Sequence, residues 1–246
     1  MRYVSQMFHP DGPTLWELAE QALSSTDRGY DLIARKFDYT PFRTPDPVVQ
    51  RCAERAADRG PVRRGIDLCC GTGAGVRWFR PLCDEAMFGI DRSAGMLAEA
   101  ERRLVDAPGD ARVGLVRGDA LALPFEDGAF DLATCFGAFG HILESDEPRF
   151  VREIHRVLAP GGRFVFATSE VPPPWSPALW MARGFNAAMR VRNAVIKPEF
   201  IMYYLTFTWP EVGSLLEAAG FEVTVDRGAF DPPFGRLLWV SAEKRR

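Results

Sequence analysis

The chain has 246 residues, of which 47% are hydrophobic and 26% are charged, and its formal net charge is −3. Such a chain can bury a full hydrophobic core in one large domain, or in one domain with an added cap. The small negative charge argues against bulk DNA or RNA as the partner, because non-specific nucleic-acid binding depends on basic side chains that neutralise phosphates.

The N-terminus and the cysteines indicate the compartment. No basic segment followed by an apolar run opens the chain, and no stretch approaches the ~18 uninterrupted apolar residues of a membrane span. The five cysteines are odd in number and lack zinc-finger spacing; they are Cys52, Cys69, Cys70, Cys83 and Cys135. We therefore expect a cytoplasmic protein with reduced thiols, no secretory signal, no transmembrane segment and no metal site.

The N-terminal part is expected to be helical. Apolar residues at helical spacing predict a helix over residues 13–36, and a second helix is predicted over 46–58. Between them, residues 40–47 contain three prolines, which predicts a loop. We expect residues 1–60 to form a helical cap that closes over the rest of the chain.

From residue 61 onward, short apolar strands alternate with amphipathic helices, which predicts a parallel sheet with helices on both faces. Strands are expected over 65–70, 86–91, 111–117, 131–136 and 162–168, and helices over 75–82, 93–105 and 146–158. A helix over 210–219 then precedes two strands, over 221–227 and 237–243. Only a loop separates these last strands, so at least one is expected to be antiparallel. The prediction for residues 61–246 is a doubly wound α/β sheet of about seven strands.

Residues 65–75, GIDLCCGTGAG, join the first strand of this sheet to its first helix. Backbone amides at a helix start can face a ligand, and glycine lets that ligand approach closely. The dinucleotide fingerprint G-x-G-x-x-G is absent, because Val76 stands where the third glycine belongs. The alternating glycines with Asp67 upstream therefore favour a ligand other than a nicotinamide dinucleotide, with a purely structural turn as the alternative.

Polar or glycine residues also follow the next three strands. Asp91 ends the second strand, where a carboxylate can bind both ribose hydroxyls; the alternative is an N-cap of the helix that begins near Ser93. Asp119 follows the third strand and could receive an exocyclic amine, with an Asx turn as the alternative. The fourth strand runs into CFGAFGHI. Since ligands of open parallel sheets bind at the carboxyl ends of the strands, these four strand ends predict one site.

This pattern resembles the class I S-adenosylmethionine-dependent methyltransferases, in particular their small-molecule branch, over residues 27–246 and best over 65–168. The family's first motif reads here as Asp67-x-x-x-Gly71-Thr72-Gly73, with Cys69 where the family usually has its first glycine. The turn LAPGGRFVF also resembles the family. The resemblance implies a Rossmann-like, doubly wound, seven-stranded and mostly parallel sheet with an antiparallel last strand. It implies S-adenosyl-L-methionine as the cofactor and S-adenosyl-L-homocysteine as the product.

The resemblance also implies roles around the cofactor. Asp91 would bind the ribose, while Asp119 and the backbone of Ala120 would contact the adenine. Phe136 and Gly137 would lie along the methionine part. Tyr30 would lie over the cofactor and Arg43 would pair with its carboxylate; a core tyrosine and a solvated arginine are the alternatives. The cofactor-binding residues expected are Tyr30, Arg43, Asp67, Cys69, Gly71, Gly73, Asp91, Arg92, Met96, Asp119, Ala120, Phe136 and Gly137.

The chemistry requires little of the protein beyond positioning, because a sulfonium carries its own activated methyl group for an in-line displacement. A neutral nucleophile also needs a general base within hydrogen-bond reach. His141 is the candidate catalytic residue, because it follows the fourth strand and would face the methyl. A substrate or cofactor contact and a structural role are the alternatives for His141.

The segment over about 170–209 is longer than a usual connection and rich in aromatic residues, which predicts a lid over an apolar pocket. Packing of these side chains onto the sheet is the alternative. The basic residues Arg183, Arg190, Arg192 and Lys197 are expected on a solvated helix face, at an acidic substrate or at a membrane surface. Candidate substrate-contacting residues are His141, Trp175, Phe185, Tyr203 and Tyr204.

We therefore predict an S-adenosylmethionine-dependent methyltransferase that acts on a small apolar or aromatic molecule, with a homodimer compatible with the sequence. A catalytically silent S-adenosylmethionine-binding regulator or partner subunit is the alternative. The segment CFGAFG lacks the Asn/Asp-Pro-Pro-Tyr/Phe motif of DNA and glutamine N-methyltransferases and the acid and amide cluster of metal-dependent O-methyltransferases. The methyl-accepting atom stays open.

Overall fold

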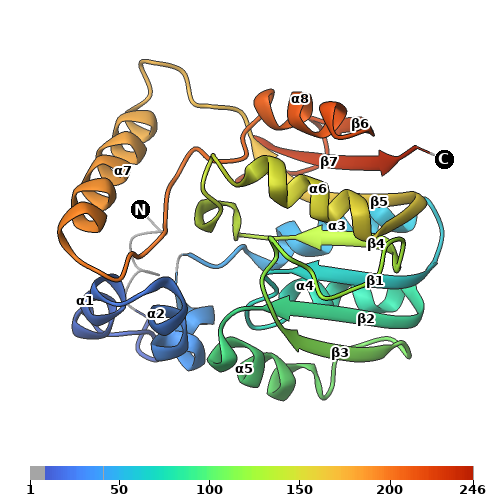
Figure 1. The fold of residues 1–246 in the computed structure, drawn as a ribbon, viewed down its shortest axis with the longest axis horizontal. Coiled ribbons are helices and arrows are strands. Elements are labelled where there is room, and N and C mark those ends of the chain that lie inside the picture. Colours follow the sequence, from blue (N-terminus) through green and yellow to red (C-terminus); the bar gives the residue numbers. More distant parts are fainter. Residues whose placement is uncertain (1–8, 41, 246) are drawn as a thin grey trace.

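The computed structural model describes residues 9–40 and 42–245, and its centre is one seven-stranded sheet (Figure 1). The strands lie in the order β3-β2-β1-β4-β5-β7-β6. Their bounds are β1 Val62–Leu68, β2 Cys83–Asp91, β3 Arg112–Arg117, β4 Phe130–Cys135, β5 Leu158–Ser169, β6 Phe221–Asp226 and β7 Leu237–Lys244. Strands β1 to β5 pair in parallel, whereas β7 is antiparallel to both β5 and β6. The predicted sheet with a reversed last strand is confirmed.

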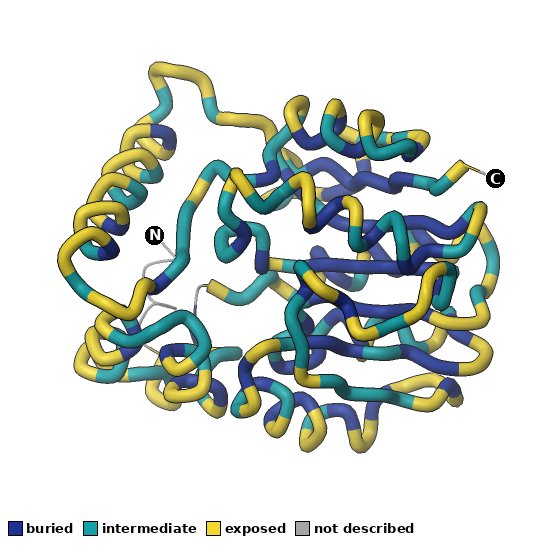
Figure 2. Tube along the Cα trace, viewed as in Figure 1, coloured by how far each residue is buried: buried dark blue, intermediate teal, exposed yellow. Residues whose placement is uncertain are grey.

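Helices cover both faces of this sheet. On one face, α3 (Asp46–Ala57), α4 (Ala74–Phe79) and α5 (Ala94–Leu104) bury apolar side chains against Met87 and Leu132. On the other, α6 (Glu147–Val157) and α8 (Glu211–Ala218) pack against Ile66 and Phe164. Figure 2 shows the central strands as the most continuously buried part of the chain. Strands buried on both faces read as apolar runs rather than as alternating patterns, which is why the sequence identifies them.

The topology places a crevice at the centre of the sheet. From β1 the chain proceeds to β2 and β3 on one side, and it then returns to β4 on the other side of β1. Connections that leave the carboxyl ends of β1 and β4 therefore diverge, and open α/β sheets bind ligands at such a switch point.

The single helix predicted over residues 13–36 is wrong. The chain forms α1 (Leu15–Leu23), then α2 (Thr26–Ile33), and then a 3-10 helix, η2 (Ala34–Tyr39). The break has a local cause: Ser25 is extended and its Oγ accepts the amide of Arg28 at 3.3 Å, which caps the start of α2. Likewise, the helix predicted over 75–82 divides into α4 and a 3-10 turn, η3 (Arg80–Leu82), which contains a proline in its first turn.

The segment predicted as a lid contains a 19-residue helix, α7 (Pro177–Val195), followed by an irregular return to α8. The end of α7 is attached to α1, because the Arg192 guanidinium donates to the carbonyls of Ala22 at 2.9 Å and Ser24 at 2.8 Å. Figure 1 shows α7 and α1 together at the side of the molecule away from β6 and β7.

The expected division into an N-terminal helical cap over residues 1–60 and an α/β domain over residues 61–246 stays a prediction. The proposed boundary near residue 60 divides α3 from the sheet on which it packs, and residues 1–8 of the expected cap lie outside the described residues. Within residues 9–40 and 42–245, no helix combines the length and the hydropathy that a bilayer crossing requires.

Candidate active site

A cavity lies at the carboxyl ends of β1, β2 and β4, beneath α2, η2 and residues 42–44. Most of the residues predicted to bind the cofactor line it together with His141, although they come from distant parts of the chain. The predicted residues that line it are Tyr30, Arg43, Asp67, Cys69, Gly71, Asp91, Arg92, Met96, Phe136, Gly137 and His141. Sequence reasoning missed several others, among them Asp27, Phe37, Phe42, Thr44 and Ser93.

The turn after β1 adopts backbone conformations that favour glycine. Gly71 has φ +52° and Gly73 has φ +88°, both in the left-handed region. Cys69 lies in the same region with φ 51°, so it carries strain of about 1 kcal/mol where the family usually has glycine. A Cβ on Gly75 would meet the carboxylate of Asp67 at 2.3 Å, so this position requires glycine.

Asp67 lies under this turn and is 2% exposed. Its Oδ1 accepts the Thr134 hydroxyl at 2.7 Å. Burial raises the pKa of Asp67 to about 7, although the Thr134 hydrogen bond opposes the shift. This carboxyl group therefore titrates near neutral pH inside the cavity.

Asp91 joins the end of β2 to the glycine turn. Its Oδ2 accepts the amide of Gly71 at 2.9 Å, and its Oδ1 accepts the amide of Ser93 at 2.9 Å. The N-cap of α5 is Ser93 and not Asp91, so the N-cap alternative for Asp91 is wrong. Burial raises the pKa of Asp91 as well. Each carboxylate oxygen can accept a second hydrogen bond, so both keep acceptor capacity for a diol.

The arginines that line the cavity are already paired with acids. Arg92 donates to Asp27 at 3.0 Å and lies 3.5 Å from Asp119. Asp67 and Asp91, by contrast, have no ion-pair partner in the part of the chain that the structure describes. A buried and a half-buried carboxyl group without a cation suit a positively charged ligand, and S-adenosylmethionine carries a sulfonium and an ammonium. These residues therefore fit the cofactor.

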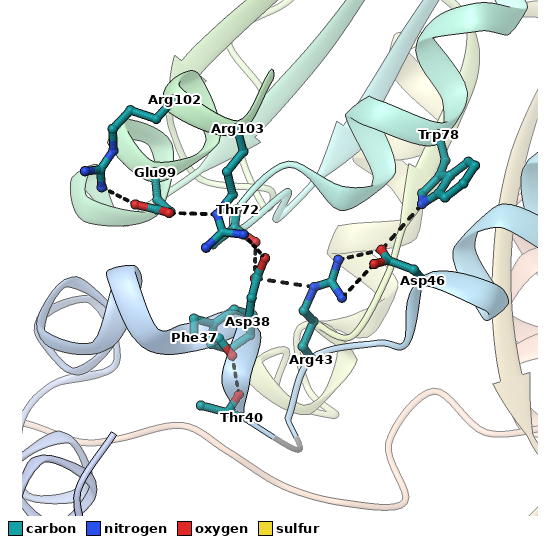
Figure 3. Close-up of polar contacts among 10 residues, drawn as sticks. All are labelled: Phe37, Asp38, Thr40, Arg43, Asp46, Thr72, Trp78, Glu99, Arg102 and Arg103. Carbon is teal, nitrogen blue, oxygen red and sulfur yellow. Dashed lines mark hydrogen bonds and ion pairs between the residues drawn. The ribbon is translucent and has the colours of Figure 1, made fainter. Parts of the chain in front are cut away.

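Arg43 belongs to a polar network that holds η2 against the glycine turn (Figure 3). The central residue is Asp38, which accepts the Thr72 hydroxyl at 2.6 Å and pairs with Arg103 at 2.6 Å. Arg43 Nε lies 3.3 Å from Asp38, and its terminal nitrogens bind Asp46. Trp78 and Glu99 extend the network on either side. The expected pairing of Arg43 with the cofactor carboxylate stays a prediction, and two carboxylates of this chain compete for that guanidinium.

Tyr30 and His141 are 111 residues apart in the sequence and hydrogen-bond directly inside the cavity, with 2.7 Å between Tyr30 Oη and His141 Nε2. His141 Nδ1 lies 2.5 Å from the carbonyl of Ile201. A carbonyl only accepts, so Nδ1 carries the proton and the Tyr30 hydroxyl donates to Nε2. Burial lowers the pKa of His141 and raises the pKa of Tyr30, so both groups are neutral near pH 7.

The attachment of α2 to α5 orients Tyr30. The neighbouring residue Asp31 accepts the Ser93 hydroxyl at 2.6 Å and the Gly95 amide at 2.8 Å, both at the start of α5. Ser93 donates its amide to Asp91 and its hydroxyl to Asp31, so it positions Asp91 directly and Tyr30 through the neighbouring Asp31.

Three predicted cofactor residues lie beside the cavity and do not line it. Asp119 forms the Asx turn that was the alternative for it, since its Oδ1 accepts the amide of Leu121 at 2.9 Å. Ala120 is buried in the core, and Gly73 is the N-cap residue of α4. The adenine contacts of Asp119 and Ala120 stay predictions.

The lid residues also lie away from this cavity. Trp175 is 83% exposed, and Phe185 packs against Tyr204 with 4.9 Å between ring centroids. Tyr203 and Tyr204 line a second cavity together with Arg183 and Arg190 of α7. Among the candidate substrate-contacting residues, only His141 lines the cavity at the carboxyl ends of β1, β2 and β4.

Glycines at two positions let the covering segments approach β4 closely. A Cβ on Gly137, whose φ is +76°, would lie 2.8 Å from the Thr44 hydroxyl. A Cβ on Gly140 would lie 2.5 Å from the carbonyl of Tyr203, whose amide donates to Gly140 at 2.8 Å. The cap and the lid therefore meet at the strand end that carries His141.

Residues 66–166 match the family model described as "Methyltransferase domain". Demethylmenaquinone methyltransferase of Thermus thermophilus is 36% identical over 182 residues, covering 71% of this chain and 80% of that protein. The enzyme of the same name from Parafrankia sp. is 32% identical over 218 residues, covering 78% of this chain and 84% of that protein. Among solved structures, phosphoethanolamine N-methyltransferase 2 of Haemonchus contortus has a TM-score of 0.63 at 18% identity, over 90% of this chain and 58% of that one.

The chain belongs to the class I S-adenosylmethionine-dependent methyltransferases, as the strand-end residues predicted. It is an enzyme and its cofactor is S-adenosyl-L-methionine. The comparisons give no support to the silent regulatory alternative.

Proposed function

We propose that the protein transfers a methyl group to the ring of a small apolar quinol. The observation that carries the proposal is the Tyr30–His141 hydrogen bond inside the cavity that the glycine turn also lines. The names of the relatives support the acceptor class, because the two relatives described above are called demethylmenaquinone methyltransferases.

The lining of the cavity combines polar and aromatic residues. Asp67, Gly71 and Asp91 are polar lining residues that would hold the cofactor, whose sulfonium supplies an activated methyl group when it is bound. Tyr30, Phe37, Phe42, Phe136 and His141 supply aromatic surface for an acceptor ring. Flat apolar ligands with few polar groups suit such walls, because a small number of hydrogen bonds then fixes their orientation.

The Tyr30–His141 pair would remove a proton from the acceptor. A quinol hydroxyl next to the Tyr30 oxygen could donate to it while Tyr30 passes its own proton to His141 Nε2. The Ile201 carbonyl keeps the tautomer of His141 whose Nε2 lone pair can accept this proton. The acceptor then becomes a phenolate, whose adjacent ring carbon is a nucleophile. After methyl transfer, the ring carbon that carries the new methyl group would lose its hydrogen as a proton to water, which restores the aromatic phenolate. His141 would then return its proton through Tyr30 to the phenolate oxygen.

The test compares two redox states of one acceptor. A short-chain demethylmenaquinol is incubated with the enzyme and the cofactor, and mass spectrometry follows the gain of a methyl group. We expect methylation of the quinol but not of the quinone, because the quinone has no hydroxyl proton to give. Equal methylation of both, or no methylation of the quinol by enzyme that binds the cofactor, would contradict the proposal.

A further inference from the structure

We propose that the outer faces of α1 and α7 form one surface that docks on an anionic lipid bilayer. The large apolar residues of this α1/α7 surface are Leu15, Trp16 and Leu23 of α1, Trp180, Met181, Val191 and Val195 of α7, and Trp175, which lies two residues before α7. Among the described residues, every large apolar side chain whose exposure exceeds 55% belongs to this set, apart from Val105. Scattered exposed apolar residues need no explanation, but a contiguous group of this size marks an interaction surface.

The pattern along α7 is that of a helix with two apolar faces. Its inward face buries Leu179 and Met189. Its outward face carries a stripe of exposed uncharged residues, bordered by the exposed Arg183 and Arg190. The residues of this stripe are Trp180, Met181, Gly184, Ala187, Ala188, Val191, Ala194 and Val195. These positions recur at the spacing of one helix stripe. A helix that faces only water carries polar residues on its outer side, so this stripe indicates an apolar partner.

The first helix of the cap continues the same surface. Leu15, Trp16 and Leu23 of α1 are 69%, 78% and 57% exposed. Trp16 and Leu23 also line a shallow groove with Pro198, just beyond the end of α7. Since Arg192 hydrogen-bonds the last turn of α1, the two helices are held as neighbours. Figures 1 and 2 show both helices with exposed outer faces on the same side of the molecule.

The charged residues at the edge of this surface indicate which kind of partner would bind it. Arg28, Arg183 and Arg190 are exposed and form no ion pair within residues 9–40 and 42–245, whereas Glu20 is the one exposed carboxylate that lines the α1 groove with Arg28. The guanidinium of Arg183 lies 5.3 Å from the Trp180 ring, so a cation and an indole stand together at the edge of the apolar stripe. Tryptophan and arginine beside a band of apolar residues are typical of the membrane interface, where the cations meet anionic headgroups. A second copy related by a two-fold axis would bring like charges together instead.

The surface is connected to the active site through two elements. α2, which carries Tyr30, follows α1 after a two-residue break, and Ile201, which holds His141, follows α7. If the proposed quinol acceptor bears a lipid tail, docking would present the cavity to the bilayer that holds it. The docking itself does not depend on that acceptor and can be measured without turnover.

The experiment is sedimentation of the purified protein with vesicles of phosphatidylcholine alone or mixed with phosphatidylglycerol. We expect binding to the mixed vesicles that weakens as salt is added. The double variant Trp180→Ser/Met181→Ser should reduce this binding about tenfold, because it removes apolar area that the lipid would cover. Arg183→Gln should reduce binding about fivefold, to anionic vesicles only. The matched control is Val105→Ser, which removes an equally exposed apolar side chain elsewhere and should change nothing.

Two further readouts separate docking from the alternatives. The Trp180→Ser/Met181→Ser variant should keep the cofactor affinity and the unfolding temperature of the parent, and it should methylate a water-soluble quinol at the parent rate. Absence of binding by the parent protein, or an equal effect of Val105→Ser, would overturn the proposal. So would a dimer seen by light scattering in the parent protein and lost in the double variant, because the partner would then be a second copy.

Discussion

Replacing Asp67 by asparagine is expected to remove most of the pH dependence of cofactor binding near neutral pH. Asp67 lines the cavity, is 2% exposed, and has a pKa of about 7 because of its burial. A cationic ligand in the same cavity favours the ionised carboxylate, so binding releases a proton from Asp67 below that pKa. The asparagine side chain would keep the shape and the Thr134 hydrogen bond without the charge.

The magnitude follows from the size of the pKa shift. If only the ionised form binds well, a group with a pKa of about 7 lowers the affinity about tenfold between about pH 8 and about pH 6. Asp91, whose pKa is also raised, adds to the loss at lower pH. S-adenosylhomocysteine lacks the sulfonium charge and should show a smaller dependence.

The same shift has a consequence for stability. A carboxyl group whose pKa rises from 3.8 in the unfolded chain to about 7 in the folded one costs stability as the pH rises through that interval. The full cost above about pH 7 is of the order of 4 kcal/mol. The Asp67→Asn variant without ligand is therefore expected to unfold at a higher temperature than the parent at alkaline pH, with a smaller difference near pH 4.

Calorimetric titration with S-adenosylmethionine across this pH range is the assay, in two buffers of different ionisation enthalpy so that proton release is counted directly. An affinity of the parent that does not change with pH would refute the reasoning. So would equal pH dependence in the parent and in the Asp67→Asn variant, since Asp67 would then carry none of it.

Substitutions at Gly137, Cys69 and Asp38 test the geometry in and beside the cavity. Gly137→Ala should destabilise the fold by about 1–2 kcal/mol and weaken cofactor binding, because its Cβ would meet Thr44 at 2.8 Å and its φ is +76°. The control is Gly184→Ala, at a helical position with no atom within 4 Å of the new Cβ, which should instead stabilise the fold by about 0.5–1 kcal/mol. Equal effects of the two variants in thermal unfolding would refute the argument. Cys69→Val should lower the free energy of unfolding by about 2 kcal/mol, because a β-branched residue is strained at a φ of 51°. Cys69→Gly should stay within about 1 kcal/mol of the parent in denaturant unfolding. A valine variant as stable as the parent would show that the turn is not strained. Asp38→Asn should lower the free energy of unfolding by about 2 kcal/mol, because Arg103 and Arg43 lose their shared carboxylate, and it should raise the dissociation constant of the cofactor. Unchanged stability and affinity would show that the network does not hold η2 in place.

The site residues at the strand ends could be predicted from the sequence, because their place depends only on where each strand stops. A strand with Asp67 or Asp91 at or next to its last residue brings that side chain to the same edge of any parallel sheet. The strained backbone at Cys69 could be expected from the same logic, since the position is normally glycine.

Contacts between distant segments could not be predicted in this way. The Tyr30–His141 and Asp38–Thr72 hydrogen bonds depend on how α2 and η2 fold back over the sheet, which no spacing in the sequence specifies. The break between α1 and α2 did have a local signal, because Ser25 offers an N-cap in the middle of the apolar pattern. The aromatic composition of residues 170–209 predicted a pocket wall, yet its most exposed ring, Trp175, faces outward.

The most direct test of the central claim is methyl transfer to the short-chain quinol by the Tyr30→Phe variant, measured at saturating cofactor with a labelled methyl group. The variant removes one hydroxyl from the cavity and with it the proton path to His141. We expect turnover to fall by about 10²–10³-fold with the cofactor affinity within about threefold of the parent, while Tyr204→Phe changes neither. Turnover of Tyr30→Phe equal to that of the parent would contradict the claim that this hydrogen-bonded pair performs the acceptor chemistry.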